Sequence, residues 1–151
     1  MLKRILFATD LSPASDLAFE SLLTFVQKFD AQVILFHSYE IGGPQITRMY
    51  NLEQSSAMHE LQQHLESRAQ VYLQKLQQEL AKINVESEIQ LIRGFAGQEI
   101  VRCAQSAECD LIFMANRGLG PVRAWLLDSV SQYVLQHSRC PVMILPTAEH
   151  K

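Results

Sequence analysis

The chain has 151 residues, of which 48% are hydrophobic and 19% are charged, with a formal net charge of -3. This composition excludes a disordered polar chain, and the length suits one domain that buries about two-thirds of its unfolded surface. The 13 basic residues form no run that would follow a phosphate backbone, so we expect no nucleic-acid partner. No apolar stretch reaches secretory or membrane-spanning length, which predicts a cytoplasmic protein without a membrane partner.

The first elements are a strand and a helix. Ile5 to Ala8 form a short apolar run that ends at Thr9-Asp10, which is typical of a strand buried on both faces. Ser12-Pro13 suits a helix N-cap followed by proline at the first helical position. We expect this helix to direct an apolar stripe into the core, formed by Leu17, Ala18, Leu22, Phe25, Val26 and Phe29.

The middle of the chain predicts two strands around a long helix. Val33 to Phe36 form a second buried strand, followed by a loop that runs from about residue 41 to 51. From about residue 53 to 83, apolar residues recur every three or four positions, which predicts an amphipathic helix. Val85 to Leu91 then alternate apolar and acidic or polar side chains, as a half-exposed edge strand does.

The C-terminal third continues the alternation of helices and strands. Gly94 and Gly97 lead into a helix that includes Ile100, and residues 111 to 114 form another apolar strand. Residues 121 to about 138 are predicted to be helical, in one piece or in two, and residues 142 to 145 form the last strand. This order predicts a single α/β domain over residues 1–151, with an open parallel five-stranded Rossmann-like sheet and helices on both faces.

The last strand, Val142 to Leu145, is apolar along its length, yet no helix follows that would cover its far side. An exposed apolar edge favours pairing with another chain. The sequence therefore predicts a homodimer through Val142 to Leu145.

The three cysteines, Cys103, Cys109 and Cys140, are odd in number and lack C-x-x-C spacing. This pattern is expected where thiols stay reduced. We interpret all three as buried packing residues.

The two ends of the chain carry a family resemblance. Ile5 to Pro13 reads I-L-F-A-T-D-L-S-P, and the C-terminal third runs from D-L-I-F-M-A-N-R-G-L-G to C-P-V-M-I-L-P. Both segments resemble the universal stress protein family, within the adenine nucleotide alpha hydrolase-like superfamily, and the resemblance covers essentially the full chain. In open α/β sheets of this kind, ligands bind beyond the carboxyl ends of the strands, where the strand order reverses.

The resemblance implies a nucleotide-binding loop, in a degraded form. Family members that bind ATP carry G-x-x-G, nine residues, then G-[ST], and the matching positions here read Ala115, Gly118, Asp128 and Ser129. Only Gly118 and Ser129 keep the pattern. Because Asp is a good N-cap, our hypothesis is that the Asp128 carboxylate supplies the anion that a bound phosphate supplies in other members, and the alternative is a simple cap.

The resemblance also implies the other contacts of a nucleotide. Asp10 matches the acidic residue that contacts the adenosine part, although a helix cap is the alternative for it. Arg117 would pair with a phosphate or form a salt bridge with Asp128. The complete set of nucleotide-binding candidates is Thr9, Asp10, Met114, Ala115, Arg117, Gly118, Ser129 and Val130.

Three further signals do not lead to a function. The glycines at 118 and 120 begin like a dinucleotide fingerprint, but Arg123 stands at the third glycine position. His59 and His64 are five residues apart, whereas a zinc-protease helix needs histidines four apart. His37 ends a predicted strand near the crevice, where an acid/base role is conceivable, but a packed or capping histidine is the favoured interpretation.

These observations predict a stress-response accessory or signalling protein that acts as a homodimer and binds an unidentified protein partner. We expect at most a weak adenine-nucleotide site for ATP or AMP, no metal, no required cofactor and no catalytic residue. One alternative is a dimeric module of the same family that binds no nucleotide. The other is a weak nucleotide hydrolase that uses the same crevice.

Overall fold

The computed structural model describes residues 1–42, 55–116 and 127–146. Its centre is one parallel five-stranded sheet with the strand order β3-β2-β1-β4-β5. The predicted fold class is therefore confirmed. The strand bounds are β1 Arg4–Ala8, β2 Gln32–Tyr39, β3 Ser87–Arg93, β4 Leu111–Asn116 and β5 Val142–Pro146.

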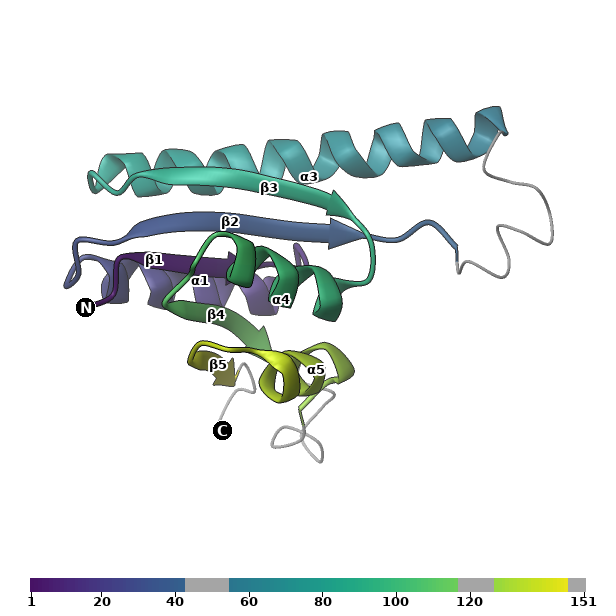
Figure 1. The fold of residues 1–151 in the computed structure, drawn as a ribbon. Coiled ribbons are helices and arrows are strands. Elements are labelled where there is room, and N and C mark those ends of the chain that lie inside the picture. The colour runs from purple at the N-terminus through teal and green to yellow at the C-terminus, as the bar shows by residue number, and fades with distance from the viewer. Residues whose placement is uncertain (43–54, 117–126, 147–151) are drawn as a thin grey trace, which may run out of the picture.

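Helices cover both faces of the sheet (Figure 1). Successive side chains of a strand point to opposite faces, so the buried strands feed two separate cores. Phe7 and Leu35 pack with α1 and α3 on one face, whereas Leu6 and Ile34 pack with α4 and α5 on the other. The helix bounds are α1 Pro13–Val26, α3 Ser56–Lys82, α4 Ala96–Ser106 and α5 Ser129–His137.

The long helix α3 runs beside β3 and extends beyond the carboxyl ends of the strands (Figure 1). A 27-residue helix is about 40 Å long, whereas an eight-residue strand such as β2 spans about 26 Å. Two tyrosine hydroxyls fix this helix to the rest of the molecule: Tyr39 donates to Glu66, and Tyr72 donates to Asp16. The first turns of α3 therefore project past the carboxyl edge of the sheet (Figure 1).

The apolar stripe predicted for the first helix is wrong at two positions. Leu17 is 53% exposed and Phe29 is 38% exposed, while the unpredicted Phe19 is buried. The helix ends at Val26, so Phe29 lies in the following turn and the helical period no longer applies to it. Leu17 lies outside the core-facing stripe, which consists of Ser15, Ala18, Phe19, Leu22 and Val26.

The sheet has β3 and β5 as its two edge strands. The prediction of an edge strand near residues 85 to 91 is thus confirmed, with its start shifted to Ser87. The side chains of Val142 to Leu145 in β5 are all half-buried in the single chain. The homodimer through this strand stays a prediction.

Other sequence predictions are met in part. Cys109 is buried as expected, but Cys103 and Cys140 are only partly buried, and all three thiols are free. The helix predicted over residues 121 to 138 is seen over Ser129–His137, with Asp128 as its N-cap, while residues 117–126 lie outside the described part of the chain. Most of the loop predicted near residues 41 to 51 also lies outside it. Among the described helices, none combines the length and apolar character needed to cross a bilayer.

Candidate ligand-binding site at the carboxyl edge of the sheet

The strand order reverses at β1, because β2 lies on one side of it and β4 on the other. In an open α/β sheet, this reversal separates the loops at the carboxyl ends and leaves a crevice. A cavity of about 120 Å³ occupies this position. Its described lining residues are Ala8, Thr9, Asp10, Ser15, Phe36, His37, Ser38, Ala96, Ile100, Met114, Ala115, Asp128 and Val130.

The loop after β1 is held by side-chain hydrogen bonds. The Thr9 hydroxyl accepts from the Leu11 amide at 3.0 Å and from the Ser15 hydroxyl at 2.6 Å. One Asp10 carboxylate oxygen accepts from the Ser12 amide at 3.0 Å, and Ser12 itself caps α1. These bonds hold Leu11 at a φ of 65°, in the left-handed region that non-glycine residues rarely adopt. Asp10 therefore shapes the turn, and the alternative that it caps the first helix is wrong.

The amino end of α5 faces the same cavity and is capped by Asp128. The Asp128 carboxylate accepts from the Ser131 amide at 2.8 Å, and the Asp128 amide donates to the Asn116 side chain at 3.2 Å. A carboxylate in this position satisfies a free helical N–H group and interacts favourably with the positive end of the helix dipole. The capping half of the Asp128 hypothesis is thus confirmed, and its competition with phosphate stays a prediction.

His37 follows the buried run of β2, is itself partly buried, and lines the cavity. Its Nδ1 atom lies 2.7 Å from the Thr9 carbonyl oxygen. Burial lowers the pKa of His37 from its ordinary value, an effect that the bond to Thr9 and the nearby Asp10 carboxylate partly oppose. The imidazole is consequently neutral at pH 7.

Comparison with known proteins agrees with this geometry. A sequence model of the universal stress protein family matches residues 1–146. This chain belongs to the universal stress protein family. Universal stress protein MJ0531 of Methanocaldococcus jannaschii is 26% identical over 143 residues, which are 95% of this chain and 81% of that protein. Universal stress protein Sll1654 of Synechocystis sp. is 31% identical over 147 residues, or 97% of this chain and 87% of that protein.

Solved universal stress protein structures share the fold. The structure of MJ0577, from Methanocaldococcus jannaschii, superposes with a TM-score of 0.79 at 25% identity and covers 96% of each chain. Universal stress protein UspA from Lactobacillus plantarum superposes with a TM-score of 0.77 at 21% identity, covering 95% of this chain and 97% of that one. The parallel sheet with helices on both faces is therefore shared with other members of the universal stress protein family.

The structure brings most of the sequence-predicted site residues of this universal stress protein together. Thr9, Asp10, Met114, Ala115 and Val130 all line the cavity. Ser129 is exposed at the start of α5 and does not belong to the cavity wall, although both of its neighbours do. Arg117 and Gly118 lie outside the described residues.

The list of nucleotide-binding candidates omitted the part of the wall that β2 and α4 contribute, although the sequence placed His37 near the crevice. Ser38, Ala96 and Ile100 line the cavity, and the sequence analysis had not favoured a ligand role for His37. The carboxyl end of β2 and the turn that begins at Gly94 were the available signals, because both meet the crevice in a sheet of this topology. Neither signal identifies individual residues without the helix geometry.

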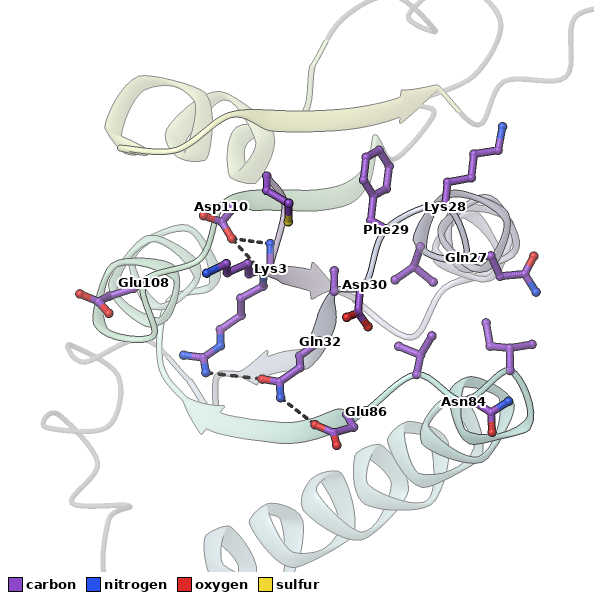
Figure 2. Close-up of a pocket in the computed structure, with 16 residues that line it drawn as sticks. Lys3, Gln27, Lys28, Phe29, Asp30, Gln32, Asn84, Glu86, Glu108 and Asp110 are labelled. Carbon is purple, nitrogen blue, oxygen red and sulfur yellow. Dashed lines mark hydrogen bonds between the residues drawn. The ribbon is translucent and has the colours of Figure 1, made fainter.

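A larger hollow of about 1150 Å³ lies at the opposite, amino edge of the sheet (Figure 2). Three of its polar side chains bond to one another: Gln32 accepts from Arg4 at 3.5 Å and donates to Glu86 at 2.7 Å, as Figure 2 shows. Asp110 accepts from the amides of Lys3 and Arg4, and these bonds lower the pKa of its carboxyl. These bonds connect the strand ends that line this hollow, the amino-edge basin. In open α/β sheets, ligands bind instead at the carboxyl edge.

Proposed function

We propose that this universal stress protein is a stress-response accessory or signalling protein of the cytoplasm, whose carboxyl-edge cavity binds an adenine nucleotide, AMP or ATP, weakly. The observation that carries this proposal is the single cavity that joins Asp10, Met114 and Val130 to the amino end of α5. Structures of two other members support it, since one is described as a complex with cAMP and another as a complex with dAMP.

The size and lining of the cavity favour weak binding. Its volume of about 120 Å³ is below the 300–1,000 Å³ typical of sites that enclose a whole small ligand. Phe36, Ile100 and Met114 offer apolar contact for a base, while Thr9 and Asp10 offer polar partners for a sugar. Part of a bound nucleotide would thus stay outside the enclosed space.

We propose that the cavity binds a ligand and does not catalyse a reaction. Binding of the ligand would then control binding of a protein partner. Among the lining residues that the structure describes there is neither lysine nor arginine to stabilise a transferred phosphoryl group. Weak hydrolysis of ATP is tested by measuring phosphate release with the wild-type protein and with Asp10→Ala. Release that the substitution abolishes would favour a hydrolase.

One observation favours a second candidate, a module of the same family that binds no nucleotide. The Asp128 carboxylate caps α5 at the amino end that would otherwise be open to a phosphate. A like charge in this position opposes a nucleotide phosphate. Binding measurements separate the two candidates.

The test is a calorimetric titration with AMP and ATP, together with mass analysis of any nucleotide released when the purified protein is denatured. Ala96 lines the cavity at the start of α4, so Ala96→Phe should block the site. Ala57→Phe makes the same change at an exposed position of α3 and is the matched control. We expect wild type and the Ala57 variant to bind AMP, and the Ala96 variant to lose binding at least tenfold. Absence of binding to the wild type, with no nucleotide released, would favour the second candidate.

A further inference from the structure

We infer that Cys109 and Cys140 form a site of reversible oxidation, at which a peroxide converts the two thiols into a disulfide. The inference does not depend on the proposed function, because no step involves a nucleotide. All three cysteines are free in the structure. Disulfides that form in reducing compartments are usually transient and redox-sensing, so a free pair of thiols agrees with such a site.

The two cysteines occupy equivalent places in the fold. Each lies two residues before a strand, Cys109 before β4 and Cys140 before β5. These strands are adjacent and parallel, with Ile112 paired to Val142. Extension of this register makes the cysteines a diagonal pair, and spacings of about 3.3 Å along a strand and 4.8 Å between strands separate their Cα atoms by about 6 Å. Disulfides join Cα atoms about 4.4–6.8 Å apart, so the backbone is suitably placed.

The two side chains meet on the same face of the sheet. Cys109 belongs to the core on the α4 and α5 face, and Cys140 packs against that core. Both line a cavity of about 160 Å³ beside the carboxyl ends of α4 and α5. Burial, and then the neighbouring Cys103 and Cys140 thiols, raise the pKa of Cys109 to about 12. This cavity shares no described lining residue with the one at the carboxyl edge of the sheet.

The two thiols differ in their access to an oxidant. Cys109 is 8% exposed and its raised pKa keeps it protonated at pH 7, whereas Cys140 is only partly buried. The Ser138 hydroxyl holds the turn at Cys140, since it donates to the Cys140 carbonyl at 2.8 Å and lies 3.6 Å from the sulfur. The cavity has room for hydrogen peroxide, because one water molecule takes about 30 Å³. We therefore assign Cys140 as the thiol that reacts first.

The reaction needs only the two thiols and the peroxide. The Cys140 sulfur, after releasing its proton, attacks one peroxide oxygen, so that an S–O bond forms, the O–O bond breaks and the departing hydroxide takes up the proton as water. Cys140 is then a sulfenic acid. The Cys109 sulfur attacks the Cys140 sulfur, an S–S bond forms, and the S–O bond breaks to release a second water with the Cys109 proton. The two thiols thus lose two electrons to one peroxide, and a dithiol reductant reverses the change.

The disulfide would close the chain from Cys109 to Cys140 into a loop. This loop contains β4 and α5, and with them Met114, Asp128 and Val130 of the carboxyl-edge cavity. A cross-link stabilises a fold mainly because it restricts the unfolded chain, and a long loop is restricted more than a short one. Oxidation should therefore raise the melting temperature by about 5–10 °C.

The experiment treats the reduced full chain with hydrogen peroxide and then measures free thiols, disulfide-linked peptides and the melting temperature. We expect free thiols in the wild type to fall from three to one, and the peptides of Cys109 and Cys140 to be linked within one chain. The melting temperature should rise, and dithiothreitol should reverse both changes.

Two substitutions identify the reacting pair. Cys103→Ser removes the third thiol of the same core and is the matched control, so it should form the same bond and show the same rise in melting temperature. Cys140→Ser should form no disulfide and show no rise. Urea unfolding of each reduced variant checks that the fold is kept. A linked peptide that contains Cys103, a bond between two chains, or three thiols that stay free in the wild type would overturn the inference.

Discussion

At the scale of single residues, Asp128 shows how one substitution changes what a helix terminus does. A glycine at this position of the family motif leaves the amides of the next turn open to a phosphate, whereas the Asp128 carboxylate accepts from the Ser131 amide at 2.8 Å. The carboxylate both stabilises α5 and opposes an incoming anion. Removing the charge should therefore separate the two effects.

Asp128→Asn should bind ATP about fivefold more tightly than the wild type, because removal of a like charge at about 4 Å is worth about 1 kcal/mol in a water-like dielectric. Asn is as good an N-cap as Asp, so thermal stability should change little. Asp128→Gly should also increase ATP affinity, with a slightly larger loss of stability. Calorimetric titration checks both variants, and unchanged or reduced ATP affinity would reject the anion hypothesis.

At the scale of elements, the close contact between α4 and α5 depends on Gly97. A Cβ atom at Gly97 would lie 2.8 Å from the Tyr133 ring. In most helices, replacing glycine with alanine stabilises the protein by about 0.5–1 kcal/mol. The contact with Tyr133 reverses this sign, because the ring must move to admit the methyl group.

Gly97→Ala should thus destabilise the protein by about 1–3 kcal/mol in urea unfolding, the usual cost of overpacking. Gln98→Ala changes the next, exposed residue of α4 and should leave stability nearly unchanged. A Gly97 variant at least as stable as the wild type would show that α4 and α5 are not in tight contact.

The attachment of α3 to β2 depends on pH. Burial, together with the hydrogen bond to Glu66, raises the pKa of Tyr39 from 10.0 to about 12. A group whose pKa is raised by folding contributes stability below its unfolded pKa and loses it above. Unfolding free energy should therefore fall between about pH 10 and pH 12, and the fall should be smaller in Tyr39→Phe. Equal pH dependence in both proteins would contradict this assignment.

The elements also show what the sequence could and could not predict. Buried runs such as Leu111 to Met114 predict strands directly, because a parallel strand covered on both faces is apolar along its length. Asp10, Met114 and Val130 were predicted from the family resemblance, and the structure places them in one cavity. The contact of His37 with the Thr9 carbonyl was not predictable, since Thr9 follows a neighbouring strand and no sequence pattern reports such a contact.

At the scale of the whole molecule, the unpaired edge of β5 bears on assembly. The Ile112 amide donates to the Pro141 carbonyl at 3.0 Å, and in a parallel ladder alternate residues bond to opposite sides. The amides of Val142 and Ile144 consequently face away from β4. The half-buried side chains of this strand add apolar surface to that edge.

Ile144→Pro should convert a dimer into a monomer, because proline removes an outward-facing amide and keeps the bonds to β4. Ile144→Ala loses the same side-chain packing and keeps the amide, so it should remain dimeric. Sedimentation at micromolar concentration measures both. A wild-type protein that sediments as a monomer would refute the homodimer.

The central claim is that ligand binds at the carboxyl edge of the sheet and not in the larger basin at the amino edge. The direct measurement is the change in amide NMR shifts of the labelled protein as AMP is added. We predict shifts at Thr9, His37, Ala96 and Val130, which line the carboxyl-edge cavity, and none at Lys3, Gln32 and Glu86, which line the basin. Shifts confined to the basin, or no shifts at all, would contradict the claim.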